Sequence, residues 1–379
     1  MSRKRNINLF VNFLLLAILI SACSPAAVLQ PTATPTPLPT PTTQPTQEVQ
    51  LSRHGYHDAV YDIKSDRIIV FGGMTDTEHM LSDTWTYDIT ANAWAKMSPS
   101  QHPSQVEGPM AYDSASDRTI LFAGTHIAEP SNGSSYAIAS QTWAYDCNTD
   151  AWTDLHAIGT PSGLLGARMV YDTQADRMIL FGGLKVPLPE DFVPKNLIFP
   201  TETWAFDFKN NTWTNMQPKT SPPGTNYFQM TYDSKSDRVL MFGATGSSSV
   251  VWGDDNVWAY DFEANTWTVE KSPVSPMMRD YGAMAYDPAL DRTFLFGGAT
   301  ADDIETPFND MWSYDYTSQT WEQVRFGSGP SARGWHTLTY SAKSDRLVLI
   351  GGGATRDSFT DEVWIFDPHA KTWTQVGPK

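Results

Sequence analysis

Short apolar runs separated by turn-forming residues are the main pattern of the chain beyond residue 50. Runs such as Ile68-Ile69-Val70-Phe71 are rich in β-branched and aromatic residues, and clusters of Gly, Asp, Asn and Thr separate them. These are the signals of short β-strands joined by tight turns. The sustained period of about 3.6 residues that marks an amphipathic helix is missing from this region. The pattern therefore predicts an all-β protein.

The predicted strands belong to a unit that occurs six times, marked by tryptophans nine residues apart. The pairs are Trp85/Trp94, Trp143/Trp152, Trp204/Trp213, Trp258/Trp267, Trp312/Trp321 and Trp364/Trp373. Each unit also has an Asp-Arg pair, such as Asp66-Arg67, four residues before the end of its main apolar run. A sheet of four short strands cannot bury both faces alone, whereas six sheets packed radially can. We predict a six-bladed β-propeller of four-stranded antiparallel blades over residues 51–379, with the tryptophans packed within and between blades and the Asp-Arg pairs holding turns.

The repeated unit resembles the kelch repeat. An apolar run ends in Phe71-Gly72-Gly73, and Trp-x-Tyr-Asp and the second tryptophan follow. The resemblance covers residues 51–379, and its departures are Ala123 and Ala244, each in place of one glycine. It implies a kelch propeller but no single activity, because this fold carries both enzymes and binding modules.

Residues 1–22 have the features of a signal peptide. A basic start at residues 3–5 precedes an apolar stretch at residues 9–20, which is too short for a membrane span of about 20 residues. The sequence Ile20-Ser21-Ala22-Cys23 resembles the bacterial lipobox, which implies cleavage before Cys23 and lipidation of its thiol. The alternative is an ordinary signal peptide with an incidental cysteine.

Residues 23–50 are expected to form a linker, since Pro and Thr dominate them and little is apolar. The propeller is thus expected outside the cytoplasm, extracellular or periplasmic, monomeric, and attached to the bacterial envelope only through lipid on Cys23. The formal net charge of −16 argues against nucleic acid or an anionic membrane surface as a partner.

The variable part of each unit indicates where ligands bind. Only the connection from strand two to strand three changes length, from 14 to 23 residues measured to the first tryptophan. Long variable loops on a rigid scaffold are typical binding elements. We expect the site on the face that carries these loops, near the central channel.

Two groups of candidate ligand-binding residues lie on that face. The first is expected to line one sector of the channel mouth and, through converging guanidinium groups, to select an anion; its members are Arg53, His57, Arg279, Tyr281, Arg333, Trp335 and His336. The alternative is that each arginine pairs with a nearby acidic residue and supports its blade. The second is an aromatic rim for sugars or peptide side chains, made of Trp252 with Tyr136, Phe192, Phe199 and Phe308, or else these residues pack the longer loops down.

Other chemistry is sparse in the sequence. The eight histidines have no metal-ligand spacing, and no nucleophile elbow, P-loop or dinucleotide motif occurs. We therefore predict no catalytic residue, no metal and no cofactor.

Three functional hypotheses remain. The favoured one is a non-catalytic module that binds a glycan or a protein partner through the long-loop face. A sugar-active enzyme is the alternative: the chain resembles sialate mutarotase, a six-unit kelch protein of the bacterial envelope, and an anionic sugar suits the arginine group. A galactose oxidase-like activity is disfavoured, because the thiol of Cys147, which a Tyr–Cys cross-link requires, is expected on the opposite face. The third hypothesis is a structural role in an envelope complex.

Overall fold

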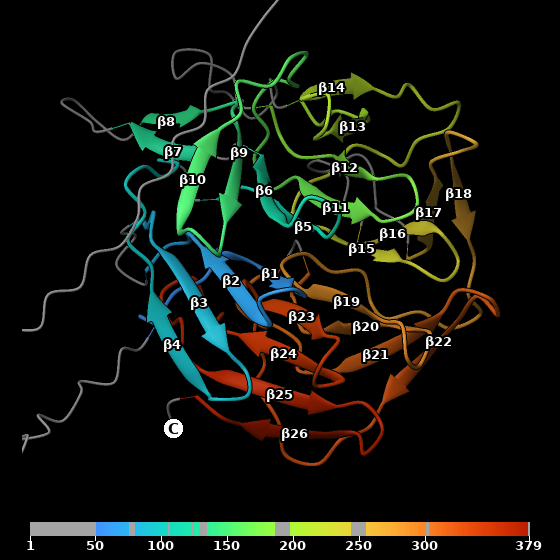
Figure 1. The fold of residues 1–379 in the computed structure, drawn as a ribbon. Coiled ribbons are helices and arrows are strands. Elements are labelled where there is room, and N and C mark those ends of the chain that lie inside the picture. Colours follow the sequence, from blue (N-terminus) through green and yellow to red (C-terminus); the bar gives the residue numbers. More distant parts are fainter. Residues whose placement is uncertain are drawn as a thin grey trace, which may run out of the picture. The chain divides into compact units, whose positions relative to one another are not determined.

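Residues Glu48–Lys379 form one compact unit, a propeller of radially arranged sheets (Figure 1). The structure, a computed structural model, describes residues 51–75, 80–104, 107–122, 125–128, 135–185, 198–243, 255–300 and 303–377. Within these ranges the chain forms six four-stranded antiparallel sheets and one two-stranded hairpin. The predicted six-bladed, all-β architecture is confirmed.

Each blade contributes one strand to each of four concentric positions. The innermost strands are β1 (Asp58–Asp62), β5 (Met110–Asp113), β11 (Arg168–Asp172), β15 (Gln229–Asp233), β19 (Ala283–Asp287) and β23 (Thr337–Ser341). The second are β2 (Arg67–Phe71), β6 (Arg118–Phe122), β12 (Arg177–Phe181), β16 (Arg238–Phe242), β20 (Arg292–Phe296) and β24 (Arg346–Ile350).

The outer half of each blade follows the first tryptophan. The third strands are β3 (Thr84–Asp88), β9 (Thr142–Asp146), β13 (Thr203–Asp207), β17 (Val257–Asp261), β21 (Met311–Asp315) and β25 (Val363–Asp367). The outermost are β4 (Ala93–Lys96), β10 (Ala151–Asp154), β14 (Thr212–Asn215), β18 (Thr266–Glu270), β22 (Thr320–Val324) and β26 (Thr372–Gln375). The hairpin of β7 (Thr125–Ala128) and β8 (Ser135–Ile138) extends the long connection of blade two.

The ring closes through its inner strands. Each of them contacts the inner strands of both neighbouring blades, and β23 of the last blade contacts β1 of the first. Blade one is built from β1–β4 and blade six from β23–β26, so no strand is exchanged between the two ends of the described propeller.

The second tryptophan of a blade packs between two aromatic rings. Trp267 lies 5.1 Å from the ring of Tyr260 in its own blade and 5.1 Å from Phe181 at the end of strand two in the preceding blade. The same sandwich surrounds Trp152, Trp213, Trp321 and Trp373. The nine-residue spacing therefore places one tryptophan at each of these blade interfaces, as predicted.

The indole N–H of this tryptophan finds a partner at some interfaces but not at others. Trp267 Nε1 donates to Thr203 Oγ1 at 2.9 Å, and Trp152 and Trp213 donate to Thr84 and Thr142 in the same way. The equivalent residues for Trp321 and Trp373 are Val257 and Met311, which have no hydroxyl. Both of these indole N–H groups lack a hydrogen-bond partner among the described residues.

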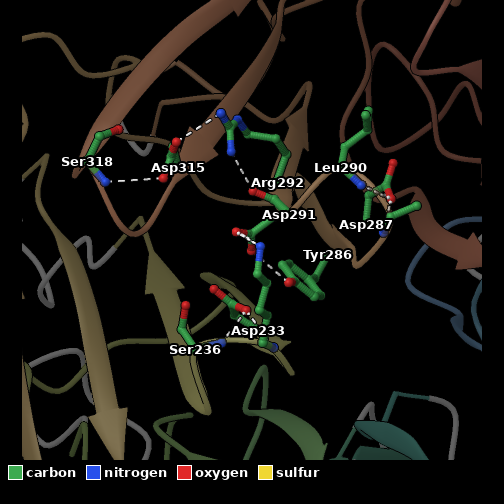
Figure 2. A network of polar contacts seen from close by, with 11 residues as sticks. Asp233, Ser236, Tyr286, Asp287, Leu290, Asp291, Arg292, Asp315 and Ser318 are labelled. Atoms are coloured by element: carbon green, nitrogen blue, oxygen red, sulfur yellow. Dashed lines mark hydrogen bonds and ion pairs between the residues drawn. The ribbon is translucent and has the colours of Figure 1, made fainter.

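The Asp-Arg pairs hold the turn between the first two strands, as the sequence predicts. In blade five, Tyr286 donates to Asp291, whose backbone has a left-handed φ of 57°. Arg292 forms an ion pair of 2.8 Å with Asp315 at the end of strand three, and Figure 2 shows this network. One polar set thus joins three strands at the short-turn end of the blade.

Residues 1–50, which carry the predicted signal peptide, Cys23 and the linker, lie outside the described residues. Among the residues that are described, no helix is long and apolar enough to cross a membrane.

Candidate functional site: the channel mouth

Six equivalent residues, one from each blade, surround the mouth of the central channel. The position that they share lies five residues before the tyrosine at the end of the inner strand, and its occupants are Tyr56, Glu107, Gly166, Tyr227, Tyr281 and Trp335. All of them line a cavity of about 30 Å³. Below it, the channel between the inner strands encloses about 430 Å³.

The four aromatic side chains of this position form one contiguous cluster. Tyr281 lies 4.6 Å from Tyr227 and 5.0 Å from Trp335, measured between ring centroids. Tyr56 lies 5.9 Å from Trp335 and 6.2 Å from each of the two other tyrosines. These separations fall in the range where aromatic rings attract one another. The three tyrosines are half-buried, and Trp335 is buried.

A chain of backbone hydrogen bonds holds this cluster from blade to blade. Tyr227 N donates to Gly166 O at 2.8 Å, Tyr281 N to Tyr227 O at 3.0 Å, Trp335 N to Tyr281 O at 2.9 Å and Tyr56 N to Trp335 O at 3.3 Å. All five residues have a left-handed φ, between 57° and 68°. Bulky residues adopt this conformation only where the surroundings impose it. The aromatic mouth is therefore pre-organised. The chain of bonds runs from Gly166 to Tyr56, and Glu107 of blade two lies between its two ends in the ring of blades.

Charged groups lie beside the aromatic cluster. The half-buried Glu107 accepts a hydrogen bond from Tyr227 and has Arg168 and Arg356 as cationic neighbours, but burial outweighs them and raises its pKa to about 7. Arg168 also faces Asp58, whose pKa is raised by burial. The guanidinium of Arg356 lies over the ring of Tyr56, 5.6 Å from its centroid, in the range of a cation–π contact.

Four of the predicted site residues line the cavity at this mouth: His57, Tyr281, Trp335 and His336. Both histidines are 5% exposed. Burial lowers the pKa of His336 to about 3 and lowers that of His57 well below its usual value, so both are neutral at pH 7. They support the mouth as uncharged groups.

Arg279 and Arg333 are not displayed in the mouth, and the expected convergence of arginines is not formed. Both side chains are fully buried. Arg279 makes a two-pronged ion pair with Asp310, at 2.5 and 3.1 Å, and Arg333 pairs with Glu362 at 2.5 Å. Each also donates to a backbone carbonyl at the end of strand two, Gly297 and Gly351 respectively. This geometry matches the alternative in which each arginine supports its own blade.

The remaining predicted residues divide into three groups. Arg53 is exposed and Phe199 is half-buried, and neither lines the cavity. Phe308 packs against the guanidinium of Arg279 at 4.3 Å and therefore belongs to the blade support. Trp252 and Phe192 lie outside the described residues, as does the side chain of Tyr136.

The sequence analysis missed Tyr56, Glu107 and Tyr227. It also missed two cationic residues, Arg168 and Arg356. Counting five residues back from the strand-end tyrosine in each of the six blades would have found Tyr56, Glu107 and Tyr227. The loop that brings Arg356 to the mouth has no such marker. In the part of the chain that the structure describes, no three His, Cys, Asp or Glu side chains are grouped so as to hold a metal ion.

Comparison with known proteins agrees with this architecture. The family model described as "KLHDC2/KLHL20/DRC7 Kelch-repeats domain" matches residues 39–243, 131–290 and 199–379. Kelch domain-containing protein 3 of Bos taurus and that of Homo sapiens are each 22% identical over 303 residues, which covers 76% of this chain and 74% of the relative.

Proposed function

Because this chain belongs to the kelch-repeat family, we propose that it is a non-catalytic binding module that holds a protein partner at the channel mouth. The observation that carries the proposal is the aromatic cluster of Tyr56, Tyr227, Tyr281 and Trp335 on a backbone held across blades. Tyrosine and tryptophan are the side chains that most often dominate protein interfaces, because they offer large rigid contact area at low entropic cost.

The sugar-active alternatives receive less support from the geometry. A sialate mutarotase-like reading needs exposed arginines for the anionic sugar, and Arg279 and Arg333 are buried in ion pairs. The cavity of about 30 Å³ has room for a water molecule but not for a sugar ring. A galactose oxidase-like reading needs a cysteine near the site, and Cys147 lies in the turn after β9. A glycan that stacks on the outer faces of the tyrosines is an outcome that the experiment must be able to detect.

Site-specific photo-crosslinking in the full chain tests the proposal. A photoreactive phenylalanine analogue replaces Tyr281 at the mouth or, as the matched control, the exposed His369 on the short-turn face. We expect a discrete protein adduct from position 281 that position 369 does not yield. Equal adducts from both positions, or none from 281 together with saturable binding on a glycan array, would overturn it.

We further propose that the propeller is exported and anchored by lipid on Cys23. The support for this is the lipobox-like sequence and the Pro/Thr-rich linker of residues 23–50. A linker of that composition favours extended polyproline II, which holds a binding domain away from a membrane.

A further inference from the structure

We propose that the outer rim of the channel mouth, above the small cavity, is a cage for a cationic side chain, an arginine or lysine of the protein partner, and that Arg356, which lies over Tyr56 at this rim, holds the position until the partner displaces it. The proposal rests on the proposed function and adds to it the chemistry of what is recognised. The proposed ligand group is a cation, whereas the arginines in the sequence had predicted an anion.

The walls of the cage have the composition that binds organic cations. Several electron-rich ring faces and one carboxylate are brought together by Tyr56, Tyr227, Tyr281, Trp335 and Glu107. Aromatic faces attract ammonium and guanidinium groups, and the attraction grows when the site is desolvated. Glu107 sits at the same ring position as the aromatic residues and is held toward them by the hydroxyl of Tyr227. A partly buried carboxylate in an aromatic ring favours a cation over an anion or a neutral group.

Arg356 already shows how a cation is held there. It lies over the face of Tyr56 at 5.6 Å and is an electrostatic neighbour of Glu107. The side chain is exposed and comes from the long loop of blade six, so a partner can reach it. The free protein therefore carries an internal guanidinium at the position where we place the partner's cation.

When its carboxylates are ionised, the charges of the mouth favour a cation there. Asp58 and Glu107 contribute two negative charges when ionised, and Arg168 and Arg356 contribute two positive ones. Arg168 is held in place by its Nε, which donates to Phe228 O at 3.0 Å. When Arg356 leaves, Glu107 loses one of the cations that lower its pKa, so its carboxylate form becomes less favourable. An incoming arginine or lysine restores the balance, and the formal net charge of −16 attracts such a partner over longer distances.

The loop that carries Arg356 is anchored in the mouth by a different residue. Phe359 is 2% exposed and packs 6.1 Å from Tyr56 and 6.2 Å from Trp335, which anchors the base of the loop. At the tip of the loop, Thr355 and Ser358 form hydrogen bonds with each other through their side chains. Within the described residues, these are their only side-chain hydrogen bonds. Displacement of Arg356 is therefore expected to leave the anchor of the loop in the mouth.

The test uses the full chain with ¹⁵N-labelled tryptophan, so that the indole N–H of Trp335, assigned through Trp335→Phe, reports on the cage. The probe is N-acetyl-arginine methylamide, and the neutral control of the same shape is N-acetyl-citrulline methylamide. In Arg356→Gln we expect a saturable shift of the Trp335 signal by the arginine probe at an affinity at least tenfold higher than in the unaltered chain. The citrulline probe should produce no saturable shift.

A double variant tests the contribution of Glu107 to cation binding. Adding Glu107→Gln to Arg356→Gln is expected to weaken binding of the arginine probe at least fivefold, while the other indole signals, unchanged, show that the propeller is folded. Equal binding of the citrulline probe, tighter binding of N-acetyl-glutamate, or no shift in Arg356→Gln would each overturn the cage. Crosslinking from position 281 is independent of these probes. A protein adduct without cation binding would therefore refute the cage alone, and loss of both would refute the binding site itself.

Discussion

Arg279 and Arg333 lie in a different environment from the one that their neighbourhood in the sequence indicated. Each precedes an inner strand, where it was expected to face a ligand, but an acidic residue just before strand three of the same blade captures it. Each ion pair links the segment before the inner strand to the segment before strand three of the same blade. A guanidinium that is buried in this way contributes to folding rather than to recognition.

Replacement of Arg333 by alanine is therefore expected to destabilise the propeller. It would leave Glu362 without its cation and Gly351 O without a donor, which should cost about 2–4 kcal/mol of unfolding free energy. Urea denaturation measures this. Arg325→Ala, at an exposed residue of the same connection between β22 and β23, is the control, and it should change the free energy by less than about 0.5 kcal/mol. A stable Arg333→Ala variant that loses its partner would restore a binding role for this residue.

Glu107 makes the stability of the mouth depend on pH. Its pKa rises from an ordinary value of 4.5 to about 7 because burial disfavours the carboxylate. Between pH 4.5 and about pH 7, Glu107 keeps its proton in the folded protein but loses it in the unfolded chain. The contribution of Glu107 to stability is therefore lost as the pH rises through 7. Glu107→Gln removes the buried charge and should be more stable than the unaltered chain at pH 8 by roughly 1–2 kcal/mol.

Thermal unfolding of both proteins at pH 5 and pH 8 checks this. The advantage of Glu107→Gln should appear at pH 8 and shrink toward pH 5, where the carboxyl of the unaltered chain is protonated. The opposite trend would mean that Arg168 and Arg356 stabilise the carboxylate more than burial penalises it.

At the scale of the element, the repeated unit is regular in its apolar contacts and irregular in its polar ones. The second tryptophan makes equivalent ring contacts at the interfaces described above. Its N–H is satisfied only where strand three of the preceding blade begins with threonine, as at Thr203. Where Val257 takes that place, Trp321 Nε1 stays unpaired among the described side chains.

This difference predicts unequal effects of the same substitution in two blades. Trp267→Phe loses ring volume and leaves Thr203 Oγ1 without its donor, whereas Trp321→Phe loses ring volume but also removes an unsatisfied N–H. We expect Trp267→Phe to cost about 1 kcal/mol more unfolding free energy than Trp321→Phe. Paired urea denaturation curves measure the difference, and equal costs would show that Trp321 has a water partner of equal value.

At the scale of the whole molecule, ring closure determines the channel mouth. Contact between β23 and β1 brings Trp335 of the last blade beside Tyr56 of the first, although the two residues are 279 positions apart in the sequence. The mouth therefore forms only when all six blades have folded. Because its aromatic residues share one backbone chain of hydrogen bonds, damage to one blade is expected to disturb the entire cluster.

The anchoring proposal also belongs to this scale. Cys23→Ala is expected to abolish metabolic labelling by a radioactive fatty acid and to move the protein from the membrane fraction to the soluble exported fraction. The propeller and its partner binding should be unaffected, because Cys23 precedes the compact unit. Unchanged membrane association in Cys23→Ala would exclude lipid on this cysteine as the anchor.

The sequence by itself determined the fold, since periodic features carry it. The tryptophan spacing, the Asp-Arg turns and the constant distances between them follow from local strand geometry, and each is repeated in every blade. Even the face that carries the candidate site could be predicted, because strand alternation places the long loops on one side.

Only the tertiary structure decided what the mouth is made of. The residues that surround it come from six separate segments, and whether a side chain faces the channel or an acidic neighbour depends on contacts within and between blades. Arg333 and Trp335 are two residues apart, yet one is buried in an ion pair within its blade and the other joins the aromatic cluster. Local patterns specify strands and turns, whereas the partner of a charged side chain is settled by packing.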